Sequence, residues 1–354
     1  MAKKNFVGII DGKALYTQNG TVVSYPLPTR AVKRIAPFCA GHANRTEHTL
    51  GSNYDLVWIE LSRGCNMQCK HCNVAAPLGD NGYLSIGTIR THLTDLLQLI
   101  RAKRVWLSGG EPTTHPNFAE ALWMIREMVP EVTLITNATR LHEPEILKPL
   151  RHGAIMCQVS LTGLDTASIA AVYGSKTAAR RILTNIKGLR KSLPNNKLIL
   201  SAVLTRASAG DIDAVIQFAR DYGYDTVIFT FFKPIGRGQA NLGFRIPLIE
   251  RVKIYDRIRR MQNKNSKISV KISGGVFDHM DKIENKRFQI RYSCQLACEE
   301  LQITSDAKVH CCTLMKNGLL NISIEEFTFA LLNNKRKVRL ASRAICPVLS
   351  ATGK

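Results

Sequence analysis

Three cysteines lie close together in the segment RGCNMQCKHCNVAAP, residues 63–77, at Cys65, Cys69 and Cys72. The chain has 354 residues and ten cysteines. Clustered cysteines can form disulfides, hold a structural metal or hold a reactive metal. The N-terminal segment shows no secretion signal, so we expect the reducing cytoplasm, where cysteines remain thiols that can bind metal.

The spacing Cys65-x3-Cys69-x2-Cys72 does not match the paired CxxC motifs of a structural zinc site. A tetrahedral zinc would also need a fourth ligand, and His71 is poorly placed for this because it is adjacent to Cys72. Three thiolates on one compact loop suit a cubane iron–sulfur cluster that leaves one iron open for a non-protein ligand. The spacing therefore favours a reactive metal centre.

The elements that must position this loop follow from the alternation of short apolar segments with amphipathic stretches, which is typical of βαβ units. Six strands are predicted, at 55–61, 104–110, 132–138, 154–161, 197–205 and 226–232. Helices are predicted at 85–100, 116–129, near 143–152, at 175–192 and at 211–223. Six such strands form an open doubly wound sheet or a partial barrel, and both place their functional loops at the carboxyl ends of the strands.

Four loops with chemical potential follow the first four predicted strands. The cysteine loop follows the first, SGGEP (108–112) the second, TNAT (136–139) the third and SLTG (160–163) the fourth. Because the carboxyl ends of parallel strands lie on one rim, we expect the four loops to meet there.

The CxxxCxxC motif after the first strand and SGGEP after the second resemble, in order and spacing, the radical S-adenosylmethionine (radical SAM) superfamily. The resemblance implies an α/β fold, a partial (βα)6 barrel. It also implies that Cys65, Cys69 and Cys72 hold a 4Fe-4S cluster whose fourth iron binds SAM. Reduction would cleave SAM to methionine and a 5′-deoxyadenosyl radical, which abstracts hydrogen from the substrate.

The same resemblance implies a set of SAM-binding residues: Gly109, Gly110, Glu111, Asn137, Ser160 and Arg181. The two glycines would let the main chain approach the methionyl ammonium, and the glutamate would support their loop. The serine and arginine match positions that contact the SAM carboxylate, and the asparagine matches a position near the ribose. This sequence departs from the common pattern where TNA replaces TNG and where Thr162 replaces an aspartate.

A second group of cysteines follows near the C-terminus: Cys294, Cys298, Cys311, Cys312 and Cys346. The chain between the second and third of these predicts a hairpin with a turn at 305–307. The group resembles the twitch or shortened SPASM extension of radical SAM enzymes, which implies one auxiliary 4Fe-4S cluster. Cys298, Cys311 and Cys346 are the expected ligands, with either Cys294 or Cys312 as the fourth. A structural zinc is the competing interpretation.

One cysteine of this second group would then be left over. We expect Cys312 to be the candidate for donating a hydrogen atom to a substrate radical, as in radical epimerases with a similar arrangement; the alternative is an inert core thiol.

The segment PIGRGQAN, residues 234–241, resembles the GRA loop common in the same subgroup. By contrast, Cys157 lies in an apolar segment and is predicted to be a buried strand residue.

Three regions are predicted along the chain. Residues 1–54 form a β-rich extension with turns at 11–12 and 19–20, residues 55–240 form the radical SAM core, and residues 241–354 form the auxiliary-cluster region. No segment approaches the roughly 18 apolar residues that a membrane span needs. We therefore expect no membrane partner.

The net charge of +22 predicts a positive surface that attracts anionic partners. The favoured substrate is a ribosomally made precursor peptide with an acidic leader, which would be oxidised, cross-linked or epimerised. The alternative is an anionic small molecule of cofactor or sugar antibiotic biosynthesis, dehydrogenated or epimerised. A nucleic-acid substrate is the least favoured, because no basic segment has interleaved aromatic residues. A flavodoxin or ferredoxin is the expected electron donor.

Overall fold

The computed structural model describes residues 54–79, 82–151, 155–262, 268–273, 300–310 and 322–332. It also describes the backbone of short strands at 5–10, 13–18, 21–26, 47–49 and 337–339. The second group of cysteines, Cys294, Cys298, Cys311, Cys312 and Cys346, lies outside the described residues. The predicted ligands of the auxiliary cluster and the predicted hydrogen donor therefore stay predictions.

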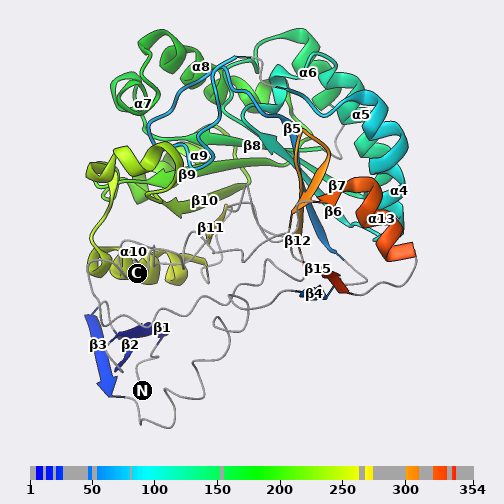
Figure 1. Ribbon diagram of the computed structural model, residues 1–354. Coiled ribbons are helices and arrows are strands. Elements are labelled where there is room, and N and C mark those ends of the chain that lie inside the picture. The colour runs from blue at the N-terminus through cyan, green and yellow to red at the C-terminus, as the bar shows by residue number, and fades with distance from the viewer. Residues whose placement is uncertain are drawn as a thin grey trace.

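A ten-stranded sheet forms the centre of the molecule (Figure 1). All six predicted strands are present and lie side by side in chain order, each parallel to the next. They are β5 (Leu56–Ser62), β6 (Arg104–Gly109), β7 (Glu131–Thr136), β8 (Ile155–Leu161), β9 (Leu198–Leu204) and β10 (Thr226–Phe231). The predicted α/β fold with a partial (βα)6 barrel is confirmed.

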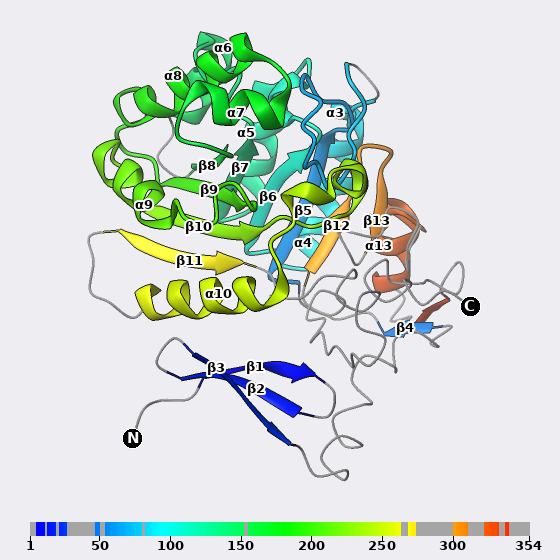
Figure 2. The same cartoon turned by 90° about the vertical axis from the view of Figure 1, so that its left-hand side faces the viewer.

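The sheet extends beyond the six predicted strands at both edges. β11 (Ser269–Ser273) pairs parallel to β10, and β12 (Glu300–Ile303) pairs parallel to β5. β13 (Lys308–His310) and β14 (Ile322–Ser323) then continue antiparallel. Figure 2 shows β12 beside β5. These short strands lack a continuous apolar run, so only the structure shows that they extend the sheet of the barrel.

The predicted hairpin at the C-terminal edge is confirmed. β12 and β13 pair through Gln302 with His310 and Ile303 with Val309. The turn between them has Ala307 at φ 59° and a hydrogen bond from the Ala307 N–H to the Thr304 carbonyl at 2.9 Å. The turn that the sequence predicts at 305–307 therefore lies where the chain reverses.

Helices cover the outer face of the sheet (Figure 1). The predicted helices are α3 (Ile86–Thr88) continued by the π-helical turn η1 (Ile89–Leu93) and α4 (Thr94–Leu99), then α5 (Phe118–Met128), α6 (Pro144–Leu150), α8 (Lys176–Ser192) and α9 (Ile212–Asp221). α7 (Thr166–Tyr173) was not predicted. Its ends are nevertheless marked in the sequence: the Asp165 side chain caps the first turn, and Gly174 ends the helix at φ 78°.

The remaining described elements lie around the barrel. The 3₁₀ turns η2 (Pro112–Thr114), η3 (Gly236–Ala240) and η4 (Leu242–Phe244) belong to its loops, and α10 (Leu248–Gln262) and α13 (Ile324–Leu332) flank the edge strands. β1 (Asn5–Ile10), β2 (Lys13–Gln18) and β3 (Thr21–Pro26) form the predicted antiparallel meander, which Figure 2 shows below α10. β4 (Glu47–Thr49) pairs with β15 (Lys337–Arg339). The predicted region boundaries at 54 and 240 stay predictions.

The core lies between the sheet and its outer helices. In β8 the residues alternate between buried and half-buried positions, and the buried set includes Cys157 and Val159 at 0% exposure. The prediction that Cys157 is a core residue is confirmed. Within the described part of the chain, no helix is long and apolar enough to span a membrane.

Leu134, at the centre of β7, tests this arrangement. Its side chain is 0% exposed, whereas Leu99 at the end of α4 is 37% exposed. We expect Leu134→Ala to lower the free energy of unfolding by about 2–5 kcal/mol, because it leaves a cavity. Leu99→Ala should cost under about 1 kcal/mol, because less apolar surface is lost. Urea unfolding followed by circular dichroism measures both; equal losses would contradict the central position of β7.

Candidate functional site

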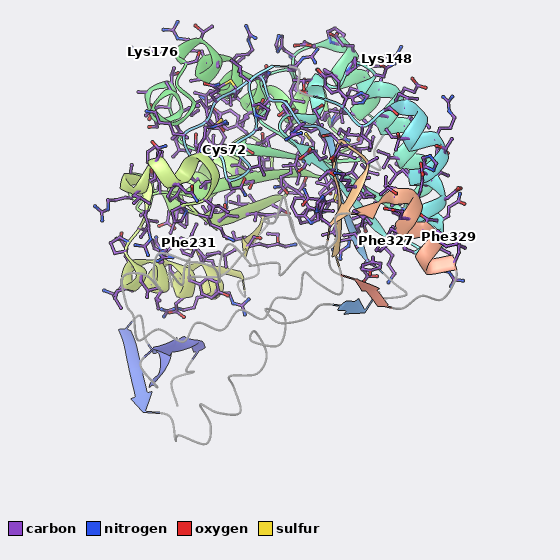
Figure 3. The ribbon with its side chains drawn as sticks, in the orientation of Figure 1. Cys72, Lys148, Lys176, Phe231, Phe327 and Phe329 are labelled. Carbon is purple, nitrogen blue, oxygen red and sulfur yellow. The ribbon has the colours of Figure 1, made fainter. Side chains whose placement is uncertain are left out.

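The cysteine loop follows β5 and is closed by main-chain hydrogen bonds. The Cys65 N–H donates to the Pro77 carbonyl at 2.9 Å, and the Gly79 N–H donates to the Cys65 carbonyl at 3.0 Å. Cys65 is buried, Cys69 and Cys72 are half-buried, and all three are free thiols. In Figure 3 the labelled Cys72 lies above the strands, near the middle of the molecule.

The surroundings of Cys65 and Cys69 favour the protonated form of both thiols in the absence of metal. Burial, with the nearby Glu111 carboxylate, raises the pKa of Cys65 to about 11. Burial, with the charges of Cys65 and Cys72, raises the pKa of Cys69 to about 12. Because a metal centre binds thiolates, loading this loop would release protons and return charge to the buried site.

His71 lies within the cysteine loop, between Cys69 and Cys72. Within the described ranges, no three His, Cys, Asp or Glu side chains are grouped closely enough to hold one metal ion. His71 packs against the Tyr173 ring at 6.0 Å between centroids, and burial lowers its pKa to about 4. The expectation that His71 is not a metal ligand stays a prediction.

Glu111, in the SGGEP loop, is buried and accepts four hydrogen bonds. Its Oε1 accepts from the Thr113 N–H at 3.2 Å, the Thr113 hydroxyl at 2.7 Å and the Thr136 hydroxyl at 2.6 Å. Its Oε2 accepts from the Asn137 N–H at 2.8 Å. Burial raises the pKa of Glu111, and these donors oppose the rise. The carboxylate therefore joins the loop after β6 to the end of β7.

Asn137 continues this network to the first cysteine. Its Nδ2 donates to the Asn66 Oδ1 at 2.9 Å and lies 3.7 Å from the Cys65 Sγ. Its Oδ1 accepts from the Thr139 N–H and hydroxyl at 2.9 and 2.6 Å. The Thr139 hydroxyl also accepts from the Asn66 Nδ2 at 2.8 Å. The predicted residues Glu111 and Asn137 thus meet the cysteine loop, and Asn66 and Thr139 are partners that the sequence reasoning missed.

The two glycines of SGGEP are required by a close approach of backbones. The Gly110 N–H donates to the Ser62 carbonyl at 2.7 Å, and the Glu111 N–H donates to the Gly64 carbonyl at 3.0 Å. A Cβ on Gly110 would collide with the Gly64 carbonyl, and Gly109 lies at φ 130°. In the structure, the backbone of the SGGEP loop approaches the start of the cysteine loop. The approach of the same backbone to a methionyl ammonium stays a prediction.

The turn after β7 explains one departure from the family pattern. Ala138 lies at φ 65°, a left-handed conformation that glycine adopts most readily, so the common TNG fits the same turn. The turn is held from α8, where the Asn185 Nδ2 donates to the Ala138 carbonyl at 2.7 Å and to the Thr139 carbonyl at 3.3 Å. The backbone of the buried Ala138 is thus held in this left-handed conformation by the Asn185 side chain of α8.

The two residues predicted at the SAM carboxylate are placed differently from one another. Ser160 lies half-buried near the carboxyl end of β8, on the rim that carries the cysteine loop. Arg181 is exposed on α8, and among the described residues no hydrogen bond or ion pair joins it to the Glu111–Asn137 network. The structure therefore joins Glu111 and Asn137 to the cysteine loop but does not join Arg181 to it.

Two further elements hold the cysteine loop from its other sides. At the end of α7, the Val172 carbonyl accepts from the Lys70 N–H at 2.9 Å. After β10, the Arg237 guanidinium donates through Nε to the Cys69 carbonyl at 3.0 Å and through Nη1 to the Ala76 carbonyl at 2.7 Å. The sequence indicates this second contact only through the resemblance of PIGRGQAN to a GRA loop.

A family model described as the radical SAM superfamily matches residues 59–219. The match begins in β5, ends in α9, and contains the cysteine loop, SGGEP, TNAT and SLTG. The chain carries a radical SAM domain. A radical SAM domain is catalytic, so the protein is an enzyme. The family implies a 4Fe-4S cluster and SAM, which the three free thiols of the loop fit.

Two curated proteins align with about half of this chain. The AdoMet-dependent heme synthase of Methanosarcina barkeri is 28% identical over 191 residues, covering 52% of this chain and 53% of that protein. Mycofactocin maturase MftC of Mycobacterium ulcerans is 30% identical over 194 residues, covering 54% of this chain and 51% of that protein. The chain spans about half the length of these curated relatives.

Solved structures that share the fold of this chain include SuiB of Streptococcus suis. SuiB bound to precursor peptide SuiA has a TM-score of 0.63 at 16% identity, covering 87% of this chain and 71% of that chain. SuiB bound to S-adenosylmethionine has a TM-score of 0.62 at 14% identity, covering 95% of this chain and 90% of that chain. At these identities the likeness establishes the fold.

Glu111→Gln tests the network that supports the radical SAM loop. An amide in place of the carboxylate must turn its NH₂ group toward either the Asn137 N–H or the threonine donors, so a donor faces a donor in both orientations. We expect the free energy of unfolding of the metal-free protein to fall by about 2–3 kcal/mol. Urea unfolding followed by circular dichroism measures the change.

The matched control is Glu120→Gln, which removes an exposed carboxylate 3.1 Å from Arg90. An exposed ion pair contributes about 0–1 kcal/mol, so this variant should stay close to the parent protein. A loss at Glu111 no larger than that of the control would contradict the supporting role assigned to the buried carboxylate.

Proposed function

We propose that this radical SAM enzyme acts on a ribosomally made precursor peptide, which it oxidises, cross-links or epimerises. The observation that carries the catalytic part is the loop of three free thiols, held in one shape by Asn137, Val172 and Arg237. When bound, the 4Fe-4S cluster and SAM supply the 5′-deoxyadenosyl radical that removes hydrogen from the substrate.

The chain's own residues have distinct tasks in this proposal. Cys65, Cys69 and Cys72 bind the cluster as thiolates. Ser160 and Arg181 bind the SAM carboxylate, a role that suits an exposed guanidinium with no ion pair among the described residues. The main chain of the SGGEP loop, supported by Glu111, faces the methionyl ammonium, and Asn137 orients the ribose while it holds the cysteine loop.

Three findings support a peptide substrate. The net charge of +22 suits an acidic leader sequence. MftC is named a maturase. SuiB, which shares the fold of this chain, has been solved with a precursor peptide bound. A protein with this fold can therefore bind a precursor peptide, as SuiB does.

We also propose one auxiliary 4Fe-4S cluster, bound by Cys298, Cys311 and Cys346 with Cys294 or Cys312. The hairpin β12–β13 supports this, because Gln302 pairs with His310 and the two ends of the hairpin, which lead to the cysteines, therefore lie together. The Glu60 Oε1 accepts a hydrogen bond at 2.8 Å from the Ser305 hydroxyl in its turn, which fixes the hairpin to β5. A cysteine left over, such as Cys312, is the proposed hydrogen donor if the reaction is an epimerisation.

A small anionic molecule is the second candidate substrate. The heme synthase among the relatives favours it, because that protein is named for a product that is not a peptide. The same positive surface would attract either substrate. The two candidates are separated by the peptide experiment below.

Replacing the triad tests the cluster assignment. Reconstituted anaerobically, the protein should carry about eight irons if two cubane clusters form. Cys65→Ala, Cys69→Ala and Cys72→Ala together should remove about half of the iron and abolish formation of 5′-deoxyadenosine from SAM under dithionite. Iron is measured colorimetrically and the nucleoside by liquid chromatography and mass spectrometry.

The matched control is Cys157→Ala, which replaces a thiol at 0% exposure in β8. It should keep the full iron content and the SAM cleavage of the parent protein, because Cys157 packs as a small apolar side chain. Iron content and SAM cleavage that survive the triple change would show that the triad does not bind the cluster.

The peptide assignment predicts modification of a partner encoded nearby. We expect co-expression with a short acidic open reading frame adjacent to the gene to give a peptide that has lost two hydrogen atoms, or that gains deuterium from heavy water without other change in mass. Tandem mass spectrometry locates the altered residue, and the triple cysteine variant is the control. An unaltered peptide, together with full SAM cleavage by the enzyme and a gene neighbourhood of cofactor or sugar enzymes, would favour the small molecule.

A further inference from the structure

The segment after β10 wraps around the outer side of the cysteine loop. We call residues 236–241 the clasp. The Arg237 N–H donates to the Cys72 carbonyl at 2.9 Å, and the Asn241 Nδ2 donates to the Lys70 carbonyl at 3.2 Å and to the Arg237 carbonyl at 2.9 Å. With the two bonds from the Arg237 guanidinium, the clasp satisfies carbonyls at four positions of the loop, residues 69, 70, 72 and 76.

Gly236 sets the distance between the two segments. It lies at φ 59°, and a Cβ there would collide with the main-chain carbonyls of Cys72 and Asn73. Any other residue would therefore push the clasp away from the loop or strain its backbone. The approach is close enough that the guanidinium reaches past Cys72 to the carbonyl of Cys69.

In the part of the chain that the structure describes, no carboxylate pairs with the charge of Arg237. Among the described residues it forms no ion pair, and its side-chain donors bind carbonyl oxygens. Its positive charge lies directly against the loop, because its Nε donates to the Cys69 carbonyl at 3.0 Å and its backbone N–H donates to the Cys72 carbonyl at 2.9 Å. On the other side of the loop, the Glu111 carboxylate accepts from the Asn137 N–H at 2.8 Å, and the Asn137 Nδ2 lies 3.7 Å from the Cys65 Sγ. The cysteine loop thus lies between a cation near Cys69 and an anion near Cys65.

We propose that Arg237 is a positioning residue with two effects: its fork of hydrogen bonds fixes the backbone that carries Cys69 and Cys72, and its unpaired charge raises the reduction potential of the cluster that they bind. A cluster that accepts one electron from an external reductant becomes more negative by one charge. A fixed cation beside it stabilises the reduced form more than the oxidised form. The inference rests on the cluster assignment and is independent of the substrate.

Two substitutions separate the two effects. Arg237→Lys keeps the positive charge but has one ammonium in place of the planar fork, so it cannot donate to the Cys69 and Ala76 carbonyls in the same geometry. Arg237→Gln keeps an amide donor but removes the charge. Arg259→Gln is the control for net charge. Arg259 is exposed on α10, so its replacement removes one positive charge at a site outside the cysteine loop.

The charge is tested by potentiometric titration of the reconstituted full-length protein, with the reduced cluster followed by electron paramagnetic resonance. Arg237→Gln should shift the reduction equilibrium toward the oxidised cluster by about tenfold, equivalent to 59 mV for a one-electron couple. Arg237→Lys and Arg259→Gln should stay within about twofold of the parent protein. A potential unchanged in Arg237→Gln at full iron content would overturn the electrostatic effect.

The hydrogen bonds of the Arg237 guanidinium are tested without metal, by hydrogen exchange and mass spectrometry of the apo-protein. Both Arg237 variants should exchange faster in residues 65–79, where the Cys65 and Gly79 amides are hydrogen-bonded within the loop, and should match the parent in α9. Unchanged exchange in both variants would overturn the positioning role. This readout needs no cluster, so it still tests the positioning role if the triad fails to bind iron. Absent iron in the parent protein would refute the proposed function and, with it, the electrostatic effect.

Discussion

The structure depends on satisfying the backbone of a loop that has no regular secondary structure of its own. Buried main-chain amides and carbonyls must find hydrogen-bond partners, and the irregular loop that carries the three cysteines does not provide all of them internally. The barrel supplies them from separate elements: the SGGEP loop through main-chain bonds to Gly64, α7 through Val172, and the clasp through Arg237 and Asn241. The loop therefore takes its shape from the strand ends around it.

The same constraint explains why polar groups are buried beside the cysteines. Glu111 lies 1% exposed, and its four donors hold the ends of β6 and β7 together while Asn137 passes the connection to Cys65. The buried carboxylate is linked to Cys65 through Asn137, and the Arg237 guanidinium donates to the Cys69 carbonyl. Fixed charges in a low-dielectric site act strongly on any charge added to it. The residues that support the loop therefore also place opposite charges on its two sides.

The barrel was accessible to prediction because its strands are buried on at least one face. Continuous or alternating apolar residues marked all six central strands to within a few positions, and the order of motifs at their ends located the cysteine loop. α7 was missed because TASIAAVY is short and apolar on most sides, although Asp165 and Gly174 mark its ends. β11 and β12 were missed as members of the sheet because their short sequences become strands by pairing with β10 and β5.

The sequence by itself located the cysteine loop: the spacing of Cys65, Cys69 and Cys72 and the SGGEP motif are local patterns, which can be recognised without coordinates. Only the tertiary structure decided which side chains hold that loop. The contact of Arg237 with Cys69 joins residues 168 positions apart, and that of Asn137 with Cys65 joins residues 72 apart. No periodicity encodes such pairs, because they arise where the curvature of the sheet brings the ends of β5, β7 and β10 to one rim.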